Sequence, residues 1–261
     1  MNADDIAARL SGGPWGDIRV VQHTGSTNAD VAELARAGAP QGLVVATLDQ
    51  RRGRGRLDRS WQLPPRSGLA VSLLLRPDEV PAARWPWLPL LAGVALQAAV
   101  AQVSEIESTL KWPNDVLVGD RKLAGILLER IDSTVGPAAV VGIGVNIAMS
   151  VEQLPVPAAT SLAIEGAAVE PADLLVALLE CSGRVYQQWC AAGGDPATAL
   201  AAAYARVSST LGARVRVQLP GGEELTGIAT GIDTAGRLLV DTGAAAVVIG
   251  AGDVVHLRTG C

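Results

Sequence analysis

The C-terminal part of the chain alternates between short apolar, largely β-branched segments and glycine-rich turns, and this alternation restricts the fold more than any other feature. From about Ser209 onward, segments such as "RVRVQL", "LTGIAT" and "AVVIG" are separated by "PGGEE", "TAGR" and "AGD". Strands this short and this closely spaced pair with their neighbours through tight turns. We therefore predict a small closed C-terminal β-barrel in residues 208–261, after a larger domain in residues 1–207.

The larger domain mixes strands and helices without the regular strand–helix–strand rhythm of a parallel sheet. We therefore predict an α+β domain with a mixed, mainly antiparallel sheet and flanking helices. The expected strands are Asp17–His23, Leu43–Asp49, Gly68–Pro77, three short strands within residues 109–131, and Ala138–Met149. The expected helices are "NADDIAARL" near the N-terminus, a helix that starts with a Thr27/Asp30 capping box and ends at Gly38, Leu88–Val103, Ala172–Ala191 and Ala197–Arg206.

Charge and apolar patterning exclude several classes of protein. The net charge of −5 argues against sequence-independent binding to nucleic acid. The N-terminal "MNADDIAARLSGG" is acidic and lacks the apolar core of a signal peptide, and the most apolar stretch, Pro89–Val103, is interrupted by Gln97. Three cysteines and two histidines without CxxC or CxxH spacing argue against a zinc site or a disulfide framework. We expect a soluble, cytoplasmic protein that does not enter a membrane.

Arginines concentrate in "QRRGRGRLDRSW", residues Gln50 to Trp61, where five of them fall between Arg51 and Arg59. We expect this segment on the loop that leaves the strand Leu43–Asp49. Its glycines allow backbone N–H groups to approach an anion, and guanidinium groups bind phosphate in a bidentate manner. A phosphate or nucleotide site, an RNA contact and a solvated loop all remain open at this point.

One of the chain's two lysines, Lys111, stands in "LKWPNDVL" between two large apolar neighbours. Lysines are usually solvated, so a turn with an exposed lysine is the simplest interpretation. The rigid Pro113 and the flanking Leu110 and Trp112 favour a charge that is held in one place. "GIGVN", Gly142 to Asn146, lacks the third glycine of a dinucleotide fingerprint and is equally compatible with a closely packed strand.

Together these segments resemble the biotin protein ligase family. The matching pieces are "STN" (Ser26–Asn28), "GRGR" (Gly53–Arg56) with "RSW" (Arg59–Trp61), "KWPND" (Lys111–Asp115), "KLAGIL" (Lys122–Leu127) and "GIGVN" (Gly142–Asn146). The resemblance spans about residues 20 to 258 and implies a class II synthetase-like catalytic domain with an SH3-like C-terminal barrel.

The resemblance implies an enzyme that makes biotinyl-5′-AMP from biotin and ATP, releases pyrophosphate, and transfers biotin to one lysine of a carrier domain. It implies ATP, biotin and Mg²⁺ as ligands, with Mg²⁺ held mainly by the ATP phosphates. The implied partner is the biotin carboxyl carrier domain of an acetyl-CoA, acyl-CoA or pyruvate carboxylase. About twenty residues precede the first expected catalytic strand, so we expect no DNA-binding role, and we expect a monomer or a weak homodimer.

The implied site residues fall into three groups. The biotin-binding residues are Ser26, Thr27, Asn28, Gln50, Gly53, Arg54, Gly55, Arg56 and Lys111. The nucleotide-binding residues are Arg54, Arg56, Arg59, Trp61, Lys111, Asn114 and Asn146. The catalytic residues are Lys111, Arg54, Arg56 and, as a candidate base for the transfer step, Asp115.

The loop departs from the family pattern at two places. Asp58 stands where the family commonly has glycine, and Arg51 and Arg52 replace small or amide residues. Two alternatives remain beside the biotin ligase: a lipoate or octanoate ligase or transferase of the same fold, and a nucleotide- or RNA-binding module without catalysis.

Overall fold

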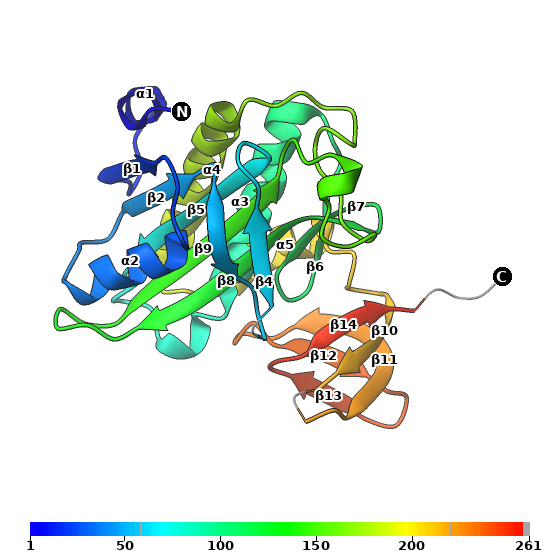
Figure 1. Cartoon of the computed structure of the whole chain (residues 1–261). Helices are drawn as coiled ribbons and strands as arrows, with labels where there is room; N and C mark the ends of the chain where they lie inside the picture. The colour runs from blue at the N-terminus through cyan, green and yellow to red at the C-terminus, as the bar shows by residue number, and fades with distance from the viewer. Residues whose placement is uncertain (58, 220, 258–261) are drawn as a thin grey trace.

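One seven-stranded sheet organises the N-terminal part of the computed structural model, which describes residues 1–57, 59–219 and 221–257 (Figure 1). The strand order is β1-β2-β5-β9-β8-β7-β6, and only the β1–β2 ladder is parallel among the described ladders of this sheet. The predicted mixed, mainly antiparallel sheet is confirmed, with one strand–helix–strand unit, β1–α2–β2, that we did not expect. The strands are β1 (Asp17–Val21), β2 (Leu43–Thr47), β5 (Gly68–Leu75), β6 (Thr109–Lys111), β7 (Asp115–Val118), β8 (Arg121–Ile131) and β9 (Ala138–Asn146).

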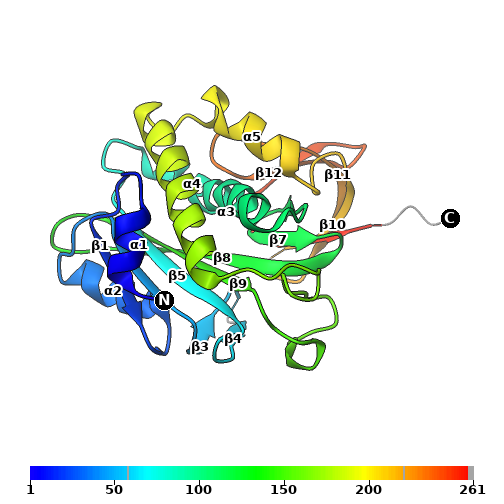
Figure 2. The same ribbon diagram turned by 90° about the horizontal axis from the view of Figure 1, so that it is seen from above.

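Helices cover both faces of this sheet (Figure 2). On one face, α3 (Trp87–Ser104) and α4 (Pro171–Ala191) pack against each other, with α3 over β8 and β9 and α4 over β5. By length and composition α3 could cross a membrane, but most of it is buried inside the protein, so it is a core helix. On the other face α2 (Thr27–Arg36) covers only part of the sheet. The remaining helical elements are α1 (Ala3–Arg9), α5 (Leu200–Val207), and the 3₁₀ turns Ala82–Arg84, Val151–Gln153 and Pro196–Thr198.

Strand β9 shows how the sequence divides the two faces. Successive side chains of a strand point to opposite sides. Val141, Ile143 and Val145 enter the large core with α3 and α4, whereas Ala138 and Val140 pack beneath α2. Further along the second face the same strand carries only Gly142 and Gly144, followed by Asn146. The sheet surface beside α2 therefore lacks bulky side chains and leaves room for polar groups from other elements.

We expected the arginine-rich segment to lie on a loop, but most of it forms strands. Its first half forms β3 (Gln50–Arg54), which pairs antiparallel with β4 (Ser60–Leu63), and only residues 55–59 connect the two strands. Gly53 makes this pairing possible, because a Cβ atom there would lie 2.3 Å from the backbone oxygen of Trp61. The result is a two-stranded hairpin above the uncovered part of the sheet (Figure 1).

The N-cap of helix α2 lies one residue before the predicted one. Ser26 is the N-cap, with extended backbone and a hydroxyl that accepts from the N–H of Ala29 at 3.4 Å. Asp30, which we assigned to the capping box, instead accepts from the hydroxyl of Thr24 at 2.6 Å. Several other predicted ends also shift: β1 stops at Val21, and α5 starts at Leu200 after a 3₁₀ turn.

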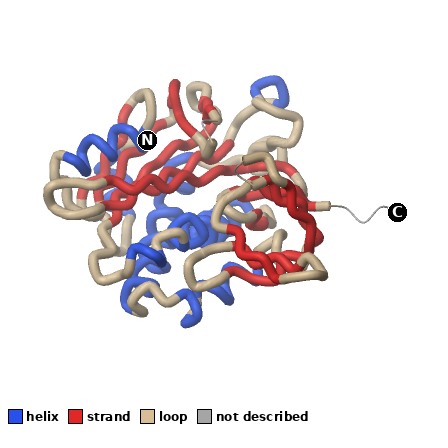
Figure 3. The backbone as a smooth tube through the Cα atoms, turned by 90° about the horizontal axis from the view of Figure 1, so that it is seen from below, coloured by secondary structure: helices blue, strands red, loops and turns tan. Residues whose placement is uncertain are grey.

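The C-terminal part is a curled, five-stranded antiparallel sheet, coloured red in Figure 3 beside the main sheet. Its order is β13-β12-β11-β10-β14, so the described ladders leave β13 and β14 at the two ends. It contacts the larger part through Trp87 and Trp112, whose indole N–H groups donate to the carbonyls of Asp233 and Gly236 at 3.0 and 3.2 Å. The domain boundary near residue 207 stays a prediction. The strands are β10 (Arg214–Gln218), β11 (Glu224–Ile232), β12 (Leu238–Asp241), β13 (Ala246–Ile249) and β14 (Asp253–His256).

Cys181 and Cys190 are free thiols on α4. The third cysteine, Cys261, and Asp58 of the arginine-rich segment lie outside the described residues.

Candidate active site

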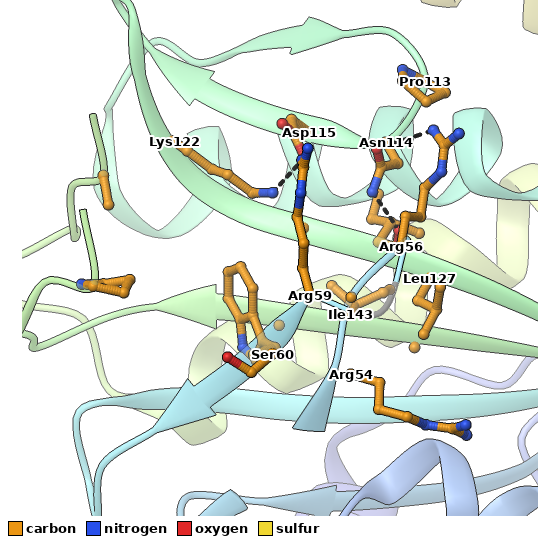
Figure 4. Close-up of a pocket in the computed structure, with 18 of the residues that line it drawn as sticks. Arg54, Arg56, Arg59, Ser60, Pro113, Asn114, Asp115, Lys122, Leu127 and Ile143 are labelled. Atoms are coloured by element: carbon orange, nitrogen blue, oxygen red, sulfur yellow. Dashed lines mark hydrogen bonds and ion pairs between the residues drawn. The ribbon is translucent and has the colours of Figure 1, made fainter. Parts of the chain in front are cut away.

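A cavity of about 880 Å³ lies between the open face of the main sheet, the β3–β4 hairpin and the C-terminal sheet (Figure 4). Its volume falls in the range of about 300–1,000 Å³ that is usual for small-molecule sites. Residues distant in sequence meet here from both sheets, from the N-terminus of α2 and from the loop after β9. The segments singled out in the sequence all contribute residues to this cavity.

Glycines form the floor of the cavity. A Cβ atom at Gly142 would lie 2.0 Å from Oδ1 of Asn28, and one at Gly144 would lie 2.3 Å from Nε1 of Trp61. At Gly125, on β8, a Cβ atom would lie 3.2 Å from both Trp61 and Lys122. The glycines thus allow the amide of Asn28 and the indole of Trp61 to lie directly on the strands. This explains "GIGVN" without a dinucleotide-binding turn.

One end of the cavity is neutral and buried. The N–H of Thr27 donates to Oε1 of Gln50 at 2.9 Å, and the hydroxyl of Ser72 lies 2.8 Å from that of Thr27 and 2.6 Å from Oδ1 of Asn28. All four side chains are at most 7 % exposed, as is that of Ser26. Buried polar groups with fixed partners present donors and acceptors in fixed directions. This end is suited to an uncharged polar ring.

The other end is cationic. Lys111 lines the cavity from the end of β6 and forms no ion pair with the residues that the structure describes. Arg56 donates to Oδ1 of Asn114 at 3.5 Å, and Asn114 is itself held by the carbonyl of Ile126 at 2.8 Å (Figure 4). Burial lowers the pKa of the Arg56 guanidinium below its ordinary value, and the nearby carboxylates of Asp253 and Asp115 oppose this shift. Fixed positive charges of this kind stabilise anions.

Arg54 and Arg59, on either side of Arg56, are paired with carboxylates on other elements. Arg54 turns away from Arg56 and Arg59 and donates to Oε1 of Glu129 at 2.8 Å (Figure 4). Arg59 pairs with Asp253 of the C-terminal sheet. The hairpin is therefore connected both to β8 and to β14, which supplies Asp253, Val254 and Val255 to the cavity wall.

The second lysine of the chain also lies in this cavity. Nζ of Lys122 is 2.6 Å from Oδ1 of Asp115 and 5.5 Å from the centre of the Trp61 ring (Figure 4). Its backbone N–H donates to the carbonyl of Ala158 at 2.7 Å, which anchors the start of β8 to the loop after β9. Lys122 is a residue that our sequence analysis missed, although its rarity was a signal that could have identified it.

The structure brings the predicted site residues together. All of them line the cavity except Gly53, whose role is to let β3 pair with β4. Arg51 and Arg52, the unusual arginines before Gly53, are exposed and do not line the cavity, and Arg51 pairs with Asp49 at 3.0 Å. Sequence reasoning missed the floor glycines, Lys122, Ser72, Glu129 and the wall contributed by β14. The spacing of residues gave no signal for Asp253, because only the packing of the two sheets brings it here.

Two family models match the chain. Residues 20–146 match the biotin/lipoate A/B protein ligase family, and residues 210–257 match the biotin protein ligase C terminal domain. The first match contains the segments that supply most of the cavity, and the second contains the C-terminal sheet.

Relatives match over nearly the whole chain. The biotin–[acetyl-CoA-carboxylase] ligase of Mycobacterium tuberculosis is 42% identical over 254 residues, which cover 95% of this chain and 92% of the relative. The enzyme of the same name from Paracoccus denitrificans is 36% identical, over 90% of this chain and 98% of its own. The biotin protein ligase from Aquifex aeolicus, solved in complex with biotin and ATP, superposes with a TM-score of 0.77 at 26% identity, covering 94% of this chain and 100% of that chain. With the cavity and its residues in place, these matches show that the chain belongs to the biotin protein ligase family.

Proposed function

We propose that this protein is an ATP-dependent ligase that activates biotin as biotinyl-5′-AMP, releases pyrophosphate, and transfers biotin to a lysine of a carrier protein. The observation that carries this proposal is the contrast between the two ends of the cavity. Ser26, Thr27, Asn28 and Gln50 offer neutral hydrogen bonds suited to a cyclic urea, and Lys111 and Arg56 offer positive charge. A ligand with an uncharged polar ring at one end and a carboxylate at the other fits this arrangement.

The first reaction, the formation of biotinyl-5′-AMP, does not require the protein to remove a proton from biotin. The attacking carboxylate is ionised at neutral pH, so it needs no general base. The difficulty is to bring two anions together and to stabilise charge on the phosphorus and the departing pyrophosphate. Lys111 and Arg56, held at the cationic end, perform this task, and Arg59 and Asn114 help to bind the nucleotide.

We expect Mg²⁺ to enter with ATP. Within the described ranges, no group of three or more His, Cys, Asp or Glu side chains is arranged to hold a metal ion. The phosphate oxygens of ATP would therefore supply most of the ligands, and Mg²⁺ would neutralise part of the charge on the departing pyrophosphate.

The second reaction needs a base, because the attacking lysine amine must lose a proton. Asp115 lines the cavity opposite Lys111 in the β6–β7 ladder, and Lys122 holds its carboxylate from one side. We propose Asp115 for this role. Replacement Asp115→Asn should slow transfer from preformed biotinyl-AMP more than it slows adenylation, measured in single-turnover experiments. Equal transfer rates for the variant and the wild type would remove Asp115 from the mechanism.

The acceptor is a biotin carboxyl carrier domain of an acetyl-CoA, acyl-CoA or pyruvate carboxylase. The relatives whose names include acetyl-CoA-carboxylase support a carboxylase substrate. We propose that the enzyme acts in the cytoplasm, where ATP and such carriers would be present together. We further propose that it acts as a monomer or weak homodimer without binding DNA; a shift of a biotin operator fragment at physiological salt would contradict the last point.

An ATP–pyrophosphate exchange assay tests the function directly. We expect exchange that depends on biotin and not on lipoate, with Lys111→Ala as the inactive control. Exchange with lipoate instead would identify a lipoate ligase of the same fold. Absence of exchange with either acid would indicate a binding module without catalysis.

A further inference from the structure

Glu129 joins the two halves of the cavity through a single carboxylate. Its Oε2 accepts from Nδ2 of Asn28 at 2.7 Å, and its Oε1 accepts from Nη2 of Arg54 at 2.8 Å. On β8 it follows Gly125 and Leu127 on the same face, and both of those residues line the cavity. Glu129 itself lies just beyond the lining, with 24% of its side chain exposed.

On one side, Glu129 determines the orientation of the Asn28 amide. An ionised carboxylate can only accept hydrogen bonds, so the atom facing it must be the amide nitrogen. Oδ1 then accepts from Ser72 at 2.6 Å, above the bare surface of Gly142. Asn28 is 5% exposed and held at both ends, and it can still offer its second amide hydrogen to the cavity. A flipped amide would direct an oxygen at the carboxylate, and the donor offered to the ligand would be lost.

On the other side, Glu129 holds the hairpin. Arg54 is the last residue of β3 and directly precedes the connection that carries Arg56 and Arg59. Its side chain is 56% exposed, so this ion pair alone contributes little free energy. Its effect is geometric, because it fixes the end of β3 over the same carboxylate that orients Asn28.

We propose that Glu129 is a positioning residue for the recognition of the cyclic urea of biotin, acting through Asn28, and that it ties the arginine-bearing hairpin to the same end of the cavity. This inference rests on the proposed function. Glu129 does not line the cavity itself, so its removal changes the binding of biotin through Asn28 and Arg54 rather than through a direct contact.

Two substitutions separate the two connections. Glu129→Gln keeps an oxygen that can accept from Asn28 but removes the charge that pairs with Arg54. Glu129→Ala removes both the acceptor for Asn28 and the charge that pairs with Arg54. Isothermal titration with biotin in the absence of nucleotide should show Kd raised about 2- to 5-fold in E129Q, as expected for a partly exposed ion pair, and about tenfold or more in E129A, as expected for hydrogen bonds to a charged group.

The KM for ATP in biotin-dependent pyrophosphate exchange provides the contrasting measurement. At saturating biotin it should rise by a smaller factor than the biotin Kd does in E129A, because among the described residues Glu129 reaches the nucleotide-binding residues only through Arg54, whereas it holds Asn28 directly. Asp132→Asn is the matched control: it removes one carboxylate charge immediately after β8, at an exposed side chain away from the cavity. D132N should bind biotin as the wild type does.

Three results would overturn the inference. Unchanged biotin Kd in E129Q and E129A would show that Asn28 is oriented without Glu129. Equal increases in the biotin Kd and the ATP KM would indicate a general structural role, as would a similar increase in D132N. If E129A does not fold, E129Q and D132N still test the connection to Arg54, and an unchanged biotin Kd in E129Q would overturn that part of the inference. Failure of wild-type exchange with biotin would refute the proposed function itself, which is a separate outcome.

Discussion

At the scale of single residues, the two lysines of the chain have opposite environments in one cavity. Lys122 is paired with Asp115 and lies over the Trp61 ring, so its charge is already partly balanced. Lys111 has no ion-pair partner in the described part of the chain, and its neighbours Leu110 and Trp112 are buried. An ammonium placed in this way is available to an anion. The sequence suggested that Lys111 was special, but only the structure distinguishes its role from that of Lys122.

Replacement Lys111→Arg should reduce the rate of biotinyl-AMP formation on the order of a hundredfold, as for loss of a transition-state donor. Arginine keeps the charge, but its planar, longer side chain does not replace a compact ammonium where two anions must meet. Pyrophosphate exchange at saturating substrates measures the effect. Arg19→Lys, at an exposed arginine paired with Asp17, is the control and should keep wild-type activity. Near-normal exchange in K111R would mean that "LKWPND" is only a well-packed strand and turn.

At the scale of elements, β9 explains why small residues alternate in "GIGVN". One face of the strand is continuous core, and the other changes from Ala138 and Val140 under α2 to Gly142 and Gly144 under the cavity. The alternation is visible in the sequence, but the identity of the groups that use the space is not. Asn28 and Trp61 come from elements far away in the chain and meet the strand only after folding.

Replacement Gly144→Ala should therefore displace the Trp61 indole and weaken nucleotide binding. The new Cβ atom would lie 2.3 Å from Nε1 and 2.4 Å from Cε2 of that ring. Overpacking of this kind costs about 1–3 kcal/mol, which corresponds to an increase of about 5- to 150-fold in the KM for ATP. At Gly231 the nearest atom is 3.6 Å away, so Gly231→Ala provides the control. Equal KM values for G144A and G231A would contradict this use of the floor.

At the scale of the whole molecule, the C-terminal sheet completes the cavity and meets the strand that carries Lys111. The backbone N–H of Trp112 donates to the hydroxyl of Thr210 at 3.0 Å. This hydroxyl lies 3.1 Å from Nε2 of His256 at the end of β14. Asp253, on the same strand, pairs with Arg59 of the hairpin. The C-terminal sheet therefore contacts both the strand of the main sheet and the hairpin that enclose the cavity.

The contact at His256 should make stability depend on pH. Burial, and then repulsion from Lys111, lower the pKa of His256 from its ordinary 6.5, while Asp120 opposes the shift. The folded protein then binds a proton at His256 less readily than the unfolded chain does. The free energy of unfolding should fall as the pH drops below about 6.5, until the folded form is protonated as well.

Urea denaturation at about pH 7.5 and about pH 5.5 tests this effect. His256→Gln should lose less stability between the two pH values than the wild type does, because the titrating group is gone. His23→Gln, at an exposed histidine, should behave like the wild type. An identical pH dependence in H256Q and wild type would show that His256 does not couple protonation to folding.

The amino-acid sequence by itself determined the class of elements, the change of architecture in the C-terminal part and the segments that form the site. These are local properties, because strand period, glycine-rich turns and motif order can be read within short windows. It misplaced the whole arginine cluster on a loop and assigned the N-cap of α2 to Thr27 instead of Ser26, since the pairing of β3 with β4 and the Ser26 cap depend on backbone geometry. The tertiary structure alone decided that Glu129 and Asp253 belong to the site. Their positions depend on contacts between residues far apart in the chain, and sequence spacing does not encode such contacts.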